Sequence, residues 1–60
     1  MDFEYVSREE STNISRLVAG GIIKSNLIFS ELGLRINFEI GEYYIVDSKQ
    51  WMIGKIKYGI

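Results

Sequence analysis

Residues 34–46, LRINFEIGEYYIV, constrain the fold more than any other segment of this chain. Over 34–40 apolar side chains alternate with polar ones, which is the period-two pattern of a strand with one buried face. Gly41 and Glu42 then suit a two-residue type II′ hairpin turn, because glycine supplies the positive φ of its first central position. The unbroken apolar run at 43–46 predicts a returning strand with apolar side chains on both faces.

Two further segments extend this hairpin into a larger sheet. Residues 47–50 (DSKQ) have the composition of a turn, and residues 51–58 (WMIGKIKY) are interpreted as a third strand. We therefore predict a three-stranded antiparallel β-meander over 34–58. An unpaired strand at 34–40 or at 51–58 would allow a partner, or a second copy of the chain, to bind by strand addition.

The N-terminal half of the chain carries helix signals. Ser7 and Glu10 have the spacing of a capping box, and the apolar residues that follow them predict a helix over about 8–18. The glycine pair at 20–21 interrupts this helix, because glycine is unfavourable in a helix interior. Gly33 stands where a second helical piece would end in a left-handed residue.

These segments predict a fold of the α+β class, with the helical segments packed on the meander. The expected organisation is one small domain over 1–60, with an extended arm over 1–7, a helical region over 8–32 and the meander over 34–58. An alternative is a small all-β barrel, in which residues 22–23 and 27–29 are strands.

Hairpin loops fix which residues lie opposite one another, so the faces of the meander can be predicted. With Gly41 and Glu42 as the turn, Phe38 pairs with Ile45 and Glu39 with Tyr44. One face is then the predicted core face, which the helical region should cover: Leu34, Ile36, Phe38, Ile40, Tyr43, Ile45, Met52, Ile56 and Tyr58.

The opposite face of the meander contains the candidate binding site. Its apolar cluster consists of Tyr44, Val46, Trp51 and Ile53, and its cationic rim consists of Arg35, Lys55 and Lys57. An exposed cluster of this kind indicates an interaction surface, and Tyr and Trp are frequent anchors of interfaces. The alternative is that the arm, through Phe3, Tyr5 and Val6, folds over this face and covers it.

The composition argues against catalysis and favours association. The chain has 60 residues, and a domain of that size buries only about 60% of the surface that its unfolded form exposes. Cysteine and histidine are absent, so disulfides, the usual zinc ligands, the commonest general base and the thiol nucleophile are absent too. No Gly-rich phosphate loop and no convincing set of metal ligands is present. We expect no enzymatic activity, no cofactor and no metal.

A protein-interaction module, such as a small inhibitor or modulator that binds a partner protein or forms a homodimer, is therefore the predicted function. The alternative is a domain that binds single-stranded nucleic acid, using Tyr44 and Trp51 for stacking with Arg35, Lys55 and Lys57 for the phosphates. The net charge of −1 disfavours this alternative, because phosphate contacts normally accompany a basic excess. No membrane span or leader is recognised, and we expect a soluble, cytoplasmic protein.

Overall fold

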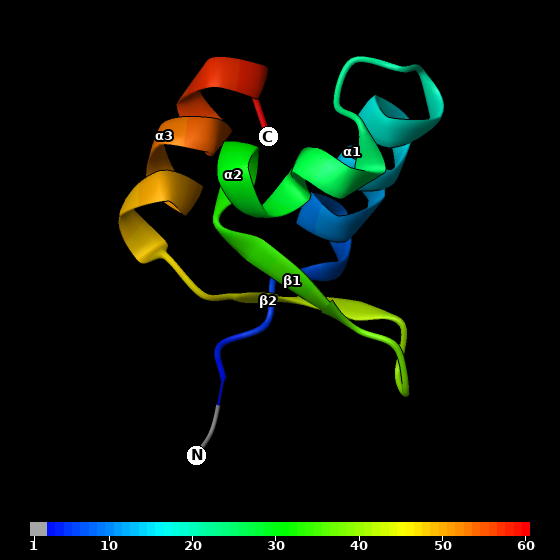
Figure 1. The fold of residues 1–60 in the computed structure, drawn as a ribbon, viewed down its shortest axis with the longest axis vertical. Helices are drawn as coiled ribbons and strands as arrows, with labels where there is room; N and C mark the ends of the chain where they lie inside the picture. Colours follow the sequence, from blue (N-terminus) through cyan, green and yellow to red (C-terminus); the bar gives the residue numbers. More distant parts are fainter. Residues whose placement is uncertain (1–2) are drawn as a thin grey trace.

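A computed structural model describes residues 3–60 of the chain. In chain order its elements are helix α1 (Arg8–Ala19), the 3₁₀ turn η1 (Ser25–Leu27), helix α2 (Ile28–Leu32), strand β1 (Leu34–Asn37), strand β2 (Glu42–Ile45) and helix α3 (Ser48–Tyr58). The helices gather at one end of the molecule, and the β1–β2 hairpin projects from the other end, beside the N-terminal arm (Figure 1). The fold is a small α+β arrangement.

The predicted three-stranded meander is wrong, and so is the barrel alternative, because the described residues form a sheet of two strands only. The segment interpreted as a third strand is helix α3. Asp47, placed in a turn by the sequence, is its N-cap, and its carboxylate accepts a hydrogen bond from the Gln50 N–H. Gly59 ends the helix with a φ of 69°, the left-handed conformation that glycine adopts easily.

The hairpin differs from the prediction in its loop. Asn37 pairs with Glu42, so the connection spans 38–41, and the Gly41 N–H donates to the Asn37 carbonyl. Gly41 has the positive φ expected of it, 69°, but as the last residue of a four-residue loop. Phe38, which was assigned to the core, is consequently 87% exposed in this loop.

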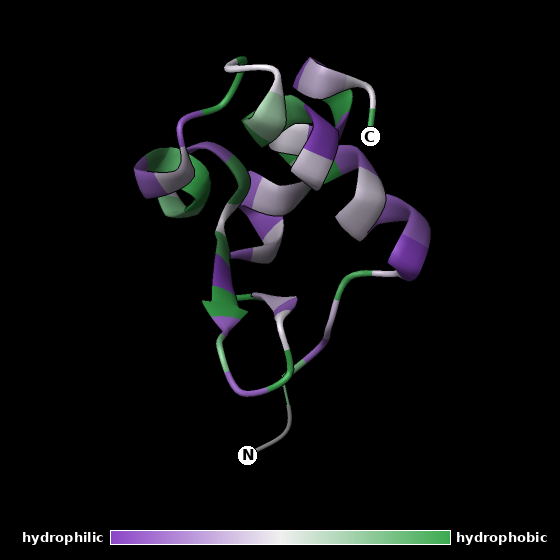
Figure 2. Ribbon diagram, turned by 90° about the vertical axis from the view of Figure 1, so that its right-hand side faces the viewer, coloured by the Kyte–Doolittle hydropathy of each residue, from purple (hydrophilic) through white to green (hydrophobic). Residues whose placement is uncertain are grey.

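The change of loop shifts the strand register by four residues, because Ile45 pairs with Leu34 and not with Phe38. An even shift leaves every side chain on its predicted face of the hairpin. Leu34, Tyr43 and Ile45 therefore still contribute to the core, whereas Tyr44 lies on the opposite face. The alternation of apolar and polar residues along β1 is visible in Figure 2.

Helix α1 begins at the predicted capping box. The Ser7 hydroxyl accepts from the Glu10 N–H, and the Glu10 carboxylate accepts from the Ser7 N–H. The predicted helical region beyond Gly21 contains the short elements η1 and α2, and α2 ends at Gly33 with a φ of 66°. No strand forms at 22–23 or at 27–29.

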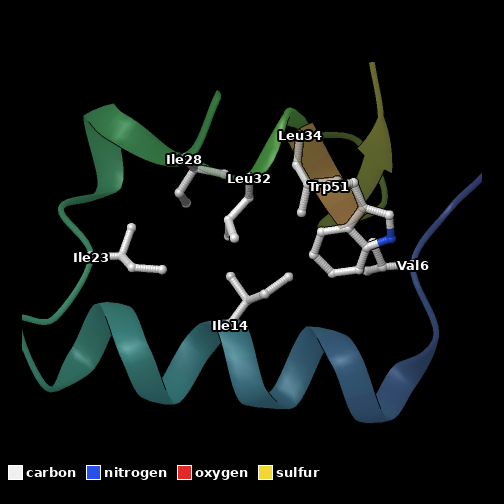
Figure 3. Close-up of a cluster of buried hydrophobic side chains, with 7 residues drawn as sticks. All are labelled: Val6, Ile14, Ile23, Ile28, Leu32, Leu34 and Trp51. Carbon is white, nitrogen blue, oxygen red and sulfur yellow. The ribbon is translucent and has the colours of Figure 1, made fainter. Parts of the chain in front are cut away.

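The core lies between α1 and the layer that α2, β1 and α3 form (Figure 3). The arm, α1, the loop after α1, α2, β1 and α3 all supply buried side chains, whereas η1 and β2 supply none. The buried cluster consists of Val6, Ile14, Ile23, Ile28, Leu32, Leu34 and Trp51. Four members of the predicted core face are exposed instead, namely Phe38, Ile40, Met52 and Ile56. The first two lie in the hairpin loop, and the last two on the outer side of α3.

Helices α2 and α3 touch along their backbones. A Cβ atom at Gly54 of α3 would lie 2.6 Å from Leu32 Cδ2 and 2.9 Å from the Glu31 carbonyl oxygen. The Gln50 side-chain amide donates to that same carbonyl at 3.0 Å. Glycine at position 54 therefore allows α2 to pack closely against α3. This packing in turn fixes where α2 lies beside β1.

Candidate partner-binding site

The predicted binding residues do not form one cluster. Tyr44 lies in β2 and pairs with Arg35 in β1, so these two remain neighbours on the outer face of the hairpin. Trp51 points into the core and is 5% exposed. Ile53 is exposed on α3, and Val46 is exposed in the connection between β2 and α3. Successive helical residues are about 100° apart, so a helix does not keep Trp51 and Ile53 on one face.

The two lysines of the predicted rim interact within the chain. Lys55 lies 3.8 Å from the Glu10 carboxylate and 5.3 Å from the centre of the Trp51 ring. Lys57 forms a 3.2 Å ion pair with Glu31. Both lysines therefore support the packing of α3 against its neighbours, whereas Arg35 forms no ion pair with any residue of 3–60.

Glu31 ties the C-terminal end of α3 to α2. Its Oε2 accepts from the Tyr58 hydroxyl at 2.7 Å and from Lys57 Nζ at 3.2 Å. The hydrogen bond from Tyr58, and then the bond and charge of Lys57, lower the pKa of Glu31. The same carboxylate raises the pKa of Tyr58 and of Lys57. These three side chains link α3 to α2, and their shifted pKa values follow from that contact. The shifts therefore do not indicate a reactive centre.

The N-terminal arm lies along β2. The Val6 N–H donates to the Tyr43 carbonyl, and the Ile45 N–H donates to the Glu4 carbonyl. The Phe3 ring lies 4.5 Å and the Tyr5 ring 5.9 Å from the Tyr44 ring, centre to centre. Phe3 and Tyr5 thus contact Tyr44, but the arm pairs with the edge of β2 and does not cover a face formed by Tyr44, Val46, Trp51 and Ile53. Val6, which was predicted to lie on that face, is part of the core instead. Phe3 nevertheless keeps half of its own surface exposed.

The arm lies on one edge of β2 and β1 lies on the other, so the sheet ends at β1. Among residues 3–60 no strand pairs with the outer edge of β1. In an antiparallel pair, the N–H and C=O of successive residues point alternately toward and away from the partner strand. The backbone groups of Tyr43 face the arm. Those of Ile36, its partner in the register, therefore point away from β2. Within residues 3–60 no hydrogen bond reaches the N–H or the C=O of Ile36.

A groove of about 240 Å³ runs along this open edge. The hairpin side is lined by Leu34, Arg35, Ile36, Phe38, Tyr43 and Tyr44, and the other wall by Ser25, Asn26, Ile28 and Phe29. The Arg35 guanidinium lies 4.9 Å from the centre of the Phe29 ring, at the rim of the groove. None of residues 3–7 of the arm lines the groove, which places the groove on the β1 side of the sheet.

The sequence pointed to part of this site. The sequence offered 34–40 as one of two possible unpaired strands, of which 34–37 is a strand, and it named Arg35 as a binding cation beside Tyr44. It did not name Ile36, Phe29 and Phe38 as binding residues. The alternation of apolar and polar residues assigned Ile36 to the core face of the hairpin, and its side chain does lie on that face. The alternation says nothing about whether the backbone groups of Ile36 are paired. Phe29 was not recognised as a binding residue, because its place at the groove depends on how α2 docks.

Comparisons with protein-family models, with curated proteins and with solved structures find no match for the chain. No helix among residues 3–60 is long and apolar enough to span a membrane. In the same part of the chain, no three acidic side chains converge where they could hold a metal ion. The case for a function therefore depends on the edge of β1 and its groove.

Proposed function

We propose that the chain is a non-enzymatic protein-interaction module that binds an extended segment of a partner protein at the open edge of β1. The observation that carries the proposal is that the N–H and C=O of Ile36 have no partner within residues 3–60 and lie beside an apolar groove. A strand added to such an edge gains main-chain hydrogen bonds, and its alternate side chains enter the adjacent pocket. A small inhibitor or modulator could act in this way, by occupying a segment of the protein that it regulates.

The size of the groove favours a single segment as the occupant. Its volume of about 240 Å³ suits one or two large apolar side chains of an extended strand, and the wall formed by η1 and α2 limits the approach of a larger body. Four residues of β1 offer few hydrogen bonds, so we expect weak, reversible binding, as in transient complexes. Self-association by pairing of two β1 edges is the competing form of the proposal.

The alternative of nucleic-acid binding has less support from the geometry. A stacking platform needs exposed rings beside free cations, but Trp51 is buried and Lys55 and Lys57 have carboxylate partners. Tyr44 and Arg35 are the members of the predicted platform that remain side by side at the surface. The cytoplasmic location stays a prediction, which imaging of the tagged chain in its host would test.

The test of the proposal compares two substitutions of one residue. Ile36→Pro removes the outward N–H without touching the β1–β2 ladder, since proline is tolerated at edge positions whose N–H faces solvent. Ile36→Ala removes the same side-chain contacts and keeps the N–H. The probe is a blocked heptapeptide of alternating threonine and leucine, titrated against isotope-labelled protein by NMR. Native circular dichroism of both variants is the folding control.

We expect the peptide to shift the amide signals of 34–37. It should bind Ile36→Ala at least about tenfold more tightly than Ile36→Pro, because loss of the Ile36 N–H in the proline variant also weakens the neighbouring main-chain hydrogen bonds of the added strand. Equal affinity for the two variants would contradict strand addition. A dimer of the unmodified chain in light scattering that dissociates in Ile36→Pro would show that a second copy, and not a partner segment, occupies the edge.

A further inference from the structure

The side chains around the open edge restrict which segment can bind, and this inference rests on the proposed strand addition. Residues directly opposite each other in neighbouring strands project from the same face of the sheet. A residue placed opposite Ile36 therefore projects to the face that carries Ile36 and Tyr43, where the groove is lined by Ile28. Phe38 stands at the end of the groove toward the hairpin loop. A large aliphatic side chain is the group that fits this position.

The neighbouring position of the added segment meets a different environment. It lies opposite Arg35, on the outer face, where the guanidinium covers the Phe29 ring and has no ion-pair partner within residues 3–60. A carboxylate at that position would pair with the guanidinium at the rim, with one face of the cation already packed on an aromatic ring. The competing carboxylate on the same face, Glu42, belongs to β2. An added strand would lie about two strand spacings from it, roughly 10 Å away.

We infer that the partner segment is an extended peptide in which a large aliphatic residue is directly adjacent to an acidic residue. The aliphatic side chain fills the groove beside Ile36, and the carboxylate pairs with Arg35. Charge complementarity sets the register of the added strand, because a shift by one residue would place the acidic side chain in the apolar groove and the aliphatic one against the cation.

Three blocked heptapeptides test this inference with the full chain. TTELETT carries acidic residues on both sides of its leucine, so that one of them lies opposite Arg35 whichever direction the strand takes. TTKLKTT reverses the charge, and TTEAETT truncates the aliphatic side chain. The protein variants are Arg35→Glu and Arg35→Gln, with circular dichroism to confirm that each is folded. Affinities are measured by NMR titration at low ionic strength and again at high ionic strength.

The unmodified chain should bind TTELETT about fivefold more tightly than TTKLKTT, as expected for a rim ion pair, and the preference should shrink at high salt. Arg35→Glu should reverse the preference, and Arg35→Gln should abolish it. TTEAETT should bind about tenfold more weakly than TTELETT, because it loses the buried aliphatic group.

The outcomes separate this inference from the proposed function. If the three peptides bind with one affinity and all depend on the Ile36 N–H, strand addition stands and the specificity inferred here is refuted. If charge preference is the same in Arg35→Glu as in the unmodified chain, the assignment of Arg35 is refuted. If none of the peptides binds at millimolar concentration, both the inference and the proposed function are overturned.

Discussion

Substitution of Gly54 by alanine should destabilise the protein, although alanine is the better helix former. In the middle of an exposed helix this exchange stabilises by about 1 kcal/mol. Here the added Cβ would lie 2.6 Å from Leu32 Cδ2 and 2.9 Å from the Glu31 carbonyl oxygen. Neither neighbour can move freely, because Leu32 is fully buried and the Glu31 carbonyl accepts a hydrogen bond from Gln50. Helices α2 and α3 must therefore separate.

The magnitude follows from two opposing effects. Overpacking of a well-packed site costs typically 1–3 kcal/mol, and two confined contacts argue for about 3 kcal/mol. After the gain in helix propensity of about 1 kcal/mol is subtracted, a net loss of about 2 kcal/mol remains. For a chain of this length it corresponds to a fall in Tm of roughly 8–16 °C. Total stability of a domain this small is of the order of 3–9 kcal/mol, so the variant should still fold.

Thermal unfolding followed by circular dichroism measures this effect, and position 52 supplies a matched control. Met52 is exposed on the same helix, so comparing Met52→Gly with Met52→Ala gives the propensity difference without a steric contact. Alanine should be the more stable residue at position 52 and the less stable one at position 54. A Tm of Gly54→Ala equal to or above that of the unmodified chain would refute the close approach of α2 and α3.

Three further predictions concern the same region. Gly33→Ala should cost more than Gly54→Ala, at least about 3 kcal/mol, because its φ of 66° is left-handed and the new Cβ would collide with the Asp47 carbonyl oxygen; an unchanged urea midpoint would contradict this. The lowered pKa of Glu31 contributes stability that is present above the ordinary pKa of a glutamate and is lost as pH falls through the lowered value. The acid limb of the stability–pH curve should therefore be shallower in Glu31→Gln, and identical curves would rule out the tie. The raised pKa of Tyr58 also contributes stability, but this contribution is lost as pH rises through that pKa. Tyr58→Phe should therefore lack this alkaline step in the stability–pH curve.

Local signals in the sequence located several features correctly. The capping box at Ser7 and Glu10 marks the start of α1, and Gly33 ends α2 in the left-handed conformation. The alternation before Gly41 identified the hairpin, and its parity placed Tyr43 and Tyr44 on opposite faces. Each of these features depends on hydrogen bonds or dihedral angles within a few residues, which is why a short stretch of sequence is enough to predict them.

The sequence of residues 48–58 does not by itself decide between a helix and a strand. Asp47 is as suitable for a turn as for an N-cap, and the apolar residues of α3 occur on more than one side of the helix, so neither period dominates the pattern. Burial of Trp51 in the core and the close contact of Gly54 with α2 favour the helix. These contacts join segments distant in sequence, and the same packing excludes Trp51 from the surface to which the sequence had assigned it.

By itself the sequence determined the first helix, the glycine that ends the second, the hairpin and the two faces of its strands, because hydrogen bonds and steric limits between near neighbours specify them. The tertiary structure alone decided that the last segment is a helix and that the arm pairs with β2. It also decided that the backbone groups of Ile36 have no partner within residues 3–60 and lie beside the groove that Phe29 lines. An unpaired strand edge is defined by what the rest of the chain does not cover, and that depends on how distant segments pack.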